Sequence, residues 1–116
     1  MINGSPRADG NTARALQEME NVFKNNGIET RLMQIGSKAV RGCISCGKCA
    51  DIGRCVFDDC VNEAAEFFEK ADGLVVATPV YYASANGTLT SFLDRLFFST
   101  SFDKTMKVGA SVVCAR

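Results

Sequence analysis

The amino-acid sequence predicts an α/β fold in which helices cover both faces of a parallel sheet. Three observations support this prediction: segments with strand and helix patterns alternate along the chain, residues 74–79 form a near-continuous apolar run ended by proline, and a polar, turn-rich stretch joins the first strand to the first helix. Strict alternation implies parallel strands joined by right-handed crossovers. With 116 residues, 47% of them hydrophobic, the chain matches the size of one domain with its own core.

The first half of the chain supplies a strand tail, a helix, a strand and a long loop. Residues 1–3 are the end of an apolar strand. A helix is predicted over residues 12–25, because apolar and small side chains recur there at helical spacing and an Asn-Asn-Gly stretch ends it. Residues 29–35 alternate with apolar side chains on both sides, which predicts a strand covered on both faces or near an edge. Residues 36–59 keep no regular period, so we interpret them as a functional loop.

The second half continues the alternation. A helix is predicted over residues 59–71, with Asp58 or Asp59 as its amino-terminal cap. The apolar run at 74–79 has the pattern of a buried parallel strand. The remaining segments are a loop, a helix and a further buried strand, over residues 80–87, 89–98 and 107–115.

The fold predicted in this way is incomplete at both ends. Only Met1 to Asn3 represent a first strand that should be central in such a sheet, and the chain stops at Arg116, where the next loop would begin. We therefore expect the chain to be a fragment of a longer protein, with Met1 an internal residue or the remnant of one.

Charge and hydropathy exclude several classes of protein. The 13 basic and 13 acidic residues cancel, so no overall field attracts the chain to nucleic acid or to an anionic membrane. The apolar runs are short and no signal-peptide pattern is present, which predicts a cytoplasmic protein without a membrane span. Six cysteines, four of them crowded between positions 43 and 55, favour metal or redox chemistry over a disulfide framework.

The stretch from Ile2 to Thr12 has the features of an anion site. Ser5, Asn11 and Thr12 offer hydroxyl and amide donors, and Arg7 offers a forked cation. The free N–H groups that open the following helix point the same way, with the positive end of the helix dipole. Each residue alone is explained as a turn or cap residue. Their combination favours a phosphate site.

The cysteine cluster has the spacing C-x2-C-x2-C-x5-C, formed by Cys43, Cys46, Cys49 and Cys55. Four thiolates with short spacers can wrap one [4Fe-4S] cluster, and the intervening glycines let the backbone turn closely around it. A zinc site is the weaker metal interpretation, because zinc sites usually combine two separated cysteine pairs. Free thiols that form disulfides on oxidation stay an open alternative. The other two cysteines, Cys60 and Cys114, are interpreted as packing residues.

No other group predicts side-chain catalysis. Asp94 and Arg95 are interpreted as a helix-surface ion pair or a contact to a neighbouring subunit, and Asp58 with Asp59 as a helix cap. The chain has no histidine and no side-chain nucleophile with a base beside it. This absence argues against a hydrolase and is expected where a cofactor supplies the chemistry.

Four motifs occur in a fixed order: Gly4-Ser5-Pro6-Arg7 with Gly10-Asn11-Thr12, the cysteine cluster, Thr78-Pro79-Val80-Tyr81-Tyr82, and Ser91-Phe92-Leu93-Asp94-Arg95. This set resembles the flavodoxin-like NAD(P)H-dependent FMN reductase family, and within it the iron-sulfur flavoproteins. The resemblance covers essentially the whole chain. It implies a flavodoxin-like three-layer sandwich with a parallel sheet in the order 2-1-3-4-5, incomplete at both ends. It also implies one FMN-binding domain over residues 1–116, with a cysteine-rich loop at 36–59.

The same resemblance implies where FMN binds. Ser5, Arg7, Asn11 and Thr12 would hold its phosphate. The isoalloxazine would lie at the carboxyl end of the strand at 74–79, where ligands of open parallel sheets bind. The residues implied there are Pro79, Val80, Tyr81, Tyr82, Ser84, Asn86 and Gly87. Cys114, Ala115 and Arg116 lie where the next flavin-contacting loop of the family starts. The alternative for the two tyrosines is an ordinary aromatic pair that caps the sheet.

The function implied is that of an oxidoreductase in which FMN takes hydride from NADH or NADPH. The electrons would pass to a small molecule, a protein or an iron-sulfur centre, and the family resemblance implies a homodimer or homotetramer. An alternative is an electron-transfer carrier between proteins, with flavin and iron-sulfur centres but no nicotinamide substrate. A third hypothesis is a metal-binding interaction module without flavin.

Overall fold

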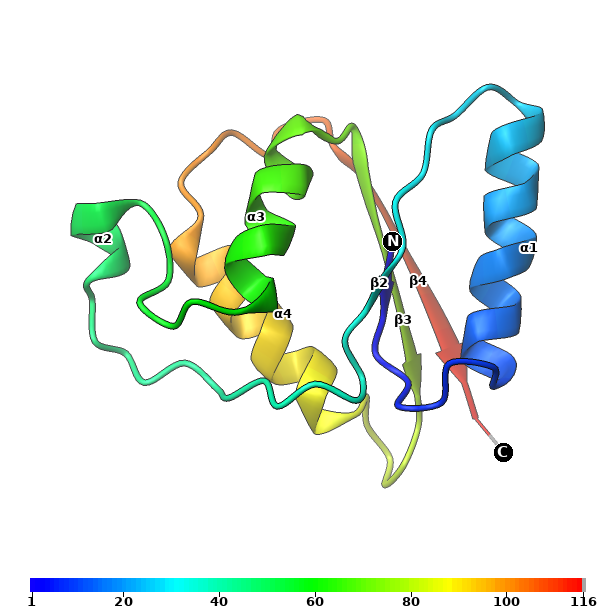
Figure 1. Cartoon of the computed structure of the whole chain (residues 1–116), viewed down its shortest axis with the longest axis horizontal. Helices are drawn as coiled ribbons and strands as arrows, with labels where there is room; N and C mark the ends of the chain where they lie inside the picture. The colour runs from blue at the N-terminus through cyan, green and yellow to red at the C-terminus, as the bar shows by residue number, and fades with distance from the viewer. Residues whose placement is uncertain (116) are drawn as a thin grey trace.

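A four-stranded parallel sheet forms the middle layer of the structure, a computed structural model that describes residues 1–115 (Figure 1). Its order is β2-β1-β3-β4, and every neighbouring pair is parallel. This order matches the first four strands of the predicted 2-1-3-4-5 sheet, so the predicted α/β, flavodoxin-like class is confirmed. The strands are β1 (Ile2–Asn3), β2 (Met33–Gln34), β3 (Gly73–Pro79) and β4 (Val108–Cys114).

Helices cover both faces of this sheet. Figure 1 shows α1 (Asn11–Asn25) on one face and α3 (Cys60–Lys70) with α4 (Gly87–Ser99) on the other. A one-turn helix, α2 (Cys49–Ile52), lies in the cysteine-rich loop and contacts α4. Within residues 1–115, no helix combines the length and the apolar composition needed to cross a membrane.

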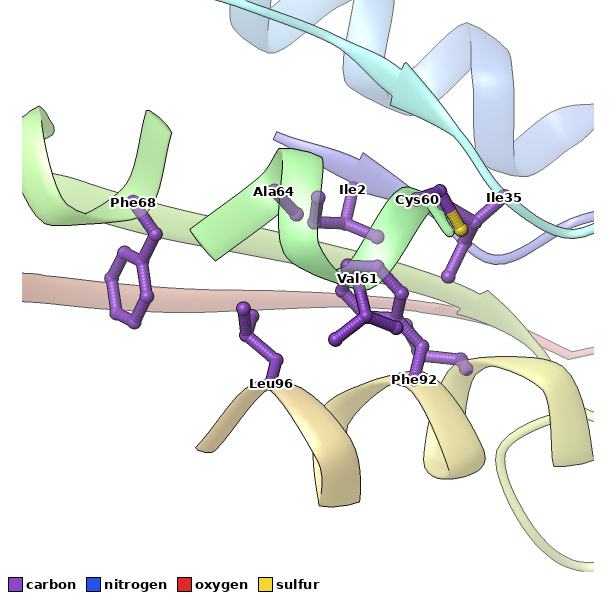
Figure 2. Close-up of a cluster of buried hydrophobic side chains, with 9 residues drawn as sticks. Ile2, Ile35, Cys60, Val61, Ala64, Phe68, Phe92 and Leu96 are labelled. Atoms are coloured by element: carbon purple, nitrogen blue, oxygen red, sulfur yellow. The ribbon is translucent and has the colours of Figure 1, made fainter. Parts of the chain in front are cut away.

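The main core lies between the sheet and the pair α3 and α4. Figure 2 shows the side chains of both helices meeting over β1 and β3. Because side chains alternate along a strand, β3 also sends Val75 and Ala77 to the opposite face, where they meet Leu16 of α1. The buried members of the main core are Ile2, Ile35, Cys60, Val61, Ala64, Phe68, Leu89, Phe92 and Leu96.

The predicted strand over residues 29–35 was wrong in its length. Only Met33–Gln34 forms a strand, and Arg31 and Leu32 are exposed. The ladder is short because β2 is an edge strand whose single partner, β1, is itself two residues long. Tertiary pairing therefore overrode the local alternation.

The prediction that the last strand is buried was also wrong. β4 forms where it was expected, but Val108 is 71% exposed and Val113 is 61% exposed. It is the outer strand of the described sheet and pairs only with β3. An apolar run therefore identified the strand without revealing its position in the sheet.

Candidate functional site

The loop that follows β1, residues 4–10, is held by polar side chains of the adjacent strands. Ser5 N–H donates to Asn3 Oδ1 at 3.0 Å, and Gln34 Nε2 donates to the carbonyl of Ser5. Asn3 lies on β1 and Gln34 on β2, so two adjacent strands fix the start of the loop. We call residues 4–10 the first loop.

The four residues predicted to bind phosphate, in the first loop and at the start of α1, comprise two buried and two exposed residues. Ser5 and Thr12 are buried, and Ser5 Oγ accepts a hydrogen bond from the backbone N–H of Arg7 at 3.2 Å. Arg7 and Asn11 are exposed. The hydroxyl of Ser5 thus shapes the turn, while the side chains of Arg7 and Asn11 are accessible to a ligand.

The amino end of α1 suits an anion. The helix begins at Asn11 with Gly10 as its N-cap, which makes no side-chain capping hydrogen bond, and its first turn contains no acidic residue. Asn11 and Thr12 therefore lie inside the first turn and do not cap it. The first amides of a helix have no partner within the helix, and the dipole places partial positive charge there.

Asn86 fastens a second loop, residues 80–87, to the first loop. Its Nδ2 donates to the carbonyl of Gly4 at 2.5 Å, and its Oδ1 caps α4 by accepting from Leu89 N–H at 2.9 Å. Its own N–H donates to Thr78 Oγ1 at 3.1 Å. The side chain is 4% exposed, so its observed contacts are with the protein. Both loops lie at the carboxyl edge of the parallel sheet, as the strand order predicted.

The second loop exposes its aromatic residues. Tyr81 is 63% exposed and Tyr82 is 94% exposed, so they do not cover the core. Pro79 and Val80 are half-buried, and Val80 N–H donates to the carbonyl of Cys114 at 3.0 Å. The end of β4 therefore lies beside this loop. Of the remaining residues predicted to contact the flavin, Ser84, Gly87 and Ala115 are exposed. Arg116 lies outside the described residues.

The cysteine cluster surrounds a small cavity. Cys43, Cys46, Cys49 and Cys55 are free thiols and all four line it. The cavity measures about 20 Å³, room for one water, so a larger group requires the exposed loop to move outward. Among residues 1–115, no three acidic or cysteine side chains are placed as ligands of a metal ion, so the positions of the thiols do not favour either metal interpretation over the other.

Local backbone geometry explains how the loop turns between the cysteines. Gly47 and Gly53 adopt φ values of 73° and 70°, in the left-handed region that favours glycine. Asn62 of α3 holds Cys55 on both sides: its Oδ1 accepts from Cys55 N–H at 3.1 Å, and its Nδ2 donates to the carbonyl of Cys55 at 3.0 Å. This buried asparagine was not singled out from the sequence.

Arg95 joins the cysteine-rich loop to α3 and α4. Its side chain is completely buried, and its two Nη atoms bind the carboxylate of Asp59 at 2.6 and 2.9 Å. The same guanidinium donates to the carbonyls of Phe57 and Arg41 at 3.1 and 3.3 Å, and its Nε donates to Cys55 Sγ at 3.2 Å. The interpretation of Arg95 as a surface residue was therefore wrong.

The position of Arg95 follows from the helix period. It lies three residues after the buried Phe92 and one before the buried Leu96, on the inward face of α4, whereas Asp94 is exposed. Its charge suggested a surface residue, but its place in the apolar stripe indicated burial. Asp59 was expected as a cap, and its Oδ1 does accept from Val61 N–H at 3.0 Å.

A model of the family described as NADPH-dependent FMN reductase matches residues 1–116. The chain belongs to the NADPH-dependent FMN reductase family. The two loops, together with the start of α1 and the end of β3, contain the first and third motifs on which the resemblance rested. The family predicted from the sequence is thus confirmed.

Curated relatives place the chain near a named branch of this family. It is 34% identical over 112 residues to an iron-sulfur flavoprotein of Methanocaldococcus jannaschii, which covers 96% of this chain and 58% of the relative. An iron-sulfur flavoprotein of Methanosarcina thermophila is 36% identical over 113 residues, covering 96% of this chain and 59% of the relative. A third, from Archaeoglobus fulgidus, is 35% identical over 95 residues, with 82% and 43% covered. The chain spans about half the length of the curated relatives it matches.

Proposed function

We propose that this chain forms the FMN site of an oxidoreductase that takes hydride from NAD(P)H and passes electrons to a small acceptor or an iron-sulfur centre. The observation that carries the proposal is the pair of loops at the carboxyl edge of the sheet, fastened together by Asn86, with the free amino end of α1 beside them. Ligands of open parallel sheets bind at this edge. Membership of the FMN reductase family supports FMN as the ligand.

The donors of the first loop fit a phosphate. Arg7 contributes a charge, Ser5, Asn11 and Thr12 contribute polar groups, and the amino end of α1 has no side-chain cap. Beside them, Asn3 Nδ2 is a buried donor without a partner in residues 1–115. We propose that a bound anion accepts from the exposed donors Arg7 and Asn11 and from the first amides of α1.

The second loop is proposed to position the isoalloxazine. Bound FMN supplies the redox chemistry, and the protein supplies position and electrostatics. The backbone N–H of Val80 donates to the carbonyl of Cys114, so the N–H groups of Tyr81 and Tyr82 are the ones proposed to stabilise negative charge on a flavin. The exposed Tyr81 and Tyr82 are available to shield one side of the ring from water.

We also propose that Cys43, Cys46, Cys49 and Cys55 hold a [4Fe-4S] cluster. Four free thiols around one cavity are a fitting donor set, and the relatives named iron-sulfur flavoproteins support the choice of cluster. Cys43 and Cys46 are exposed, so the outward movement that a cluster requires is assigned to their part of the loop, while Asn62 and Arg95 hold Cys55. The same proposal includes a small-molecule or protein electron acceptor, a homodimeric or homotetrameric state and a cytoplasmic location.

Anaerobic spectroscopy tests the proposal. Purified holoprotein mixed with NADPH or NADH should lose its flavin absorption, and iron and sulfide assays should find about four of each per chain. If neither nicotinamide bleaches the flavin band, the reductase hypothesis is rejected in favour of an electron-transfer carrier. Protein that binds no FMN after reconstitution would leave only the metal-binding module.

Replacing Arg7 by alanine should weaken FMN binding by about 1.5–3 kcal/mol, the contribution of a charge-assisted hydrogen bond to phosphate. Fluorescence titration of the apoprotein with FMN measures this change. Arg14→Ala is the matched control, because Arg14 is exposed on α1 and pairs with Glu18 at 2.5 Å. Equal FMN affinity in the wild type and Arg7→Ala would remove Arg7 from the phosphate site.

A further inference from the structure

Helix α4 presents two polar side chains to the cysteine cavity. Arg95 and Ser99 are four residues apart, hence on one face of the helix, and both line the cavity with the four thiols. Arg95 is fully buried and Ser99 is 6% exposed.

Arg95 is fixed so that one N–H points at a thiol. Its Nη atoms are occupied by the carboxylate of Asp59 and by two backbone carbonyls, which orient the planar guanidinium. In that orientation Nε lies 3.2 Å from Cys55 Sγ. Because Asp59 balances the charge of Arg95, the effect on Cys55 comes mainly from the directed N–H···S hydrogen bond.

Ser99 has the opposite property, since its hydroxyl has no partner. Its Oγ is buried and makes no hydrogen bond to any of residues 1–115. Leaving a buried hydroxyl unpaired costs free energy, so such groups usually have a function or a missing partner. The cavity that it lines is walled by sulfur and apolar side chains, among them Phe57 and Phe98. A sulfur acceptor held by the thiols would complete its hydrogen bonding.

We propose that Arg95 and Ser99 are the hydrogen-bond donors that set the reduction potential of the iron-sulfur cluster, Arg95 through Cys55 and Ser99 through a sulfur of the cluster or of its ligands. The inference rests on the cluster proposed above. Hydrogen bonds to cluster sulfurs tune its potential, because donors stabilise the additional negative charge of the reduced form. Removing either donor therefore shifts the potential to a more negative value.

Ser99→Ala provides the sharpest test, because it should not lower the stability of the cluster-free protein but should lower the reduction potential of the cluster. Cluster-free protein should be as stable as the wild type or more stable, since an unpaired buried hydroxyl is removed. Reconstituted protein should bind the same amount of iron but show a more negative midpoint potential in an anaerobic titration with dithionite followed by electron paramagnetic resonance. Ser101→Ala, at an exposed serine outside the cavity, is the control and should retain the wild-type potential.

A spectroscopic test of Arg95 has its main readout in the wild-type holoprotein, so the expected coupling can be measured without a variant. Arginine labelled with ¹⁵N at Nε should show a hyperfine coupling to the reduced cluster, absent in Arg95→Lys and retained in Arg54→Lys, whose exposed side chain pairs with Asp58. Arg95→Lys should also have a more negative potential at an unchanged iron content.

The outcomes separate the two proposals. Wild-type protein without iron and sulfide after anaerobic reconstitution would overturn the cluster and with it the roles of both donors. A wild-type cluster whose potential is unchanged in Ser99→Ala would overturn the role of Ser99 alone. A cluster without a coupling to arginine Nε would overturn the role of Arg95.

Discussion

Replacing Asp59 by alanine should lower the free energy of unfolding by about 3–5 kcal/mol, because it leaves a buried guanidinium without its counter-charge. Arg95 has no exposed side-chain surface, and Asp59 binds both of its Nη atoms. Alanine also removes the cap that Asp59 provides to Val61 N–H. Small domains are stable by only about 5–15 kcal/mol, so this loss leaves a marginal protein.

Two further variants separate the charge from the cap. Asp59→Asn retains an oxygen that can accept from Val61 N–H but loses the negative charge, so most of the loss should remain. Asp58→Ala removes the neighbouring carboxylate, which is 82% exposed and lies 3.5 Å from Arg54, and should change stability by less than about 0.5 kcal/mol. Urea unfolding followed by circular dichroism measures all three. Equal stability of the Asp58 and Asp59 alanine variants would contradict a structural role for the pair that Asp59 forms with the buried Arg95.

The same pair predicts a dependence on acid. Burial alone would raise the pKa of Asp59, but the hydrogen bonds from Arg95 and from Val61 N–H, with the charge of Arg95, lower this pKa below its ordinary value. A lowered pKa in the folded state stabilises the protein above the unfolded pKa, and this stabilisation is lost as pH falls through the folded pKa. The difference in unfolding free energy between the wild type and Asp59→Asn should therefore be full at neutral pH and shrink below about pH 4.

Local patterns predicted most of the fold because local and tertiary preferences agree there. The apolar stripes of α1, α3 and α4 and the apolar run of β3 lie where burial by the sheet requires them. The failures are at the edges of the sheet, in β2 and β4. The number of partners that a strand has is a property of the assembled sheet, and the pattern of a single segment does not contain it.

The candidate site likewise contains some residues whose roles local sequence patterns predicted and others whose contacts these patterns did not predict. The donors of the first loop were predicted because a strand, a polar turn and a helix are adjacent in the sequence. Asn86 and Arg95 were not assigned their contacts, because their partners are distant in the chain: the hydrogen bond from Asn86 to Gly4 spans 82 residues and that from Arg95 to Cys55 spans 40. Residues that fasten one loop to another have no local pattern of their own.

Replacing Gly36 by alanine should disrupt the first loop from beneath. A Cβ atom at this position would overlap the carbonyl group of Ser5 and the carbonyl oxygen of Gly4, which are backbone atoms that cannot rotate away. Gly36 N–H also donates to the carbonyl of Asn3 at 3.2 Å, which fixes the glycine to the end of β1 from which the loop starts. Overpacking of this kind costs about 1–3 kcal/mol of stability, or more where the backbone must shift.

The effect on FMN binding should exceed that of Arg7→Ala, because displacement of the loop moves every donor of the proposed phosphate site together. Gly109→Ala is the matched control: its new Cβ would have no atom of residues 1–115 within 4 Å. FMN titration and thermal unfolding of both variants distinguish the two consequences. A Gly36→Ala protein with wild-type FMN affinity would show that the flavin phosphate binds elsewhere, since the loop cannot keep its shape with a side chain at position 36.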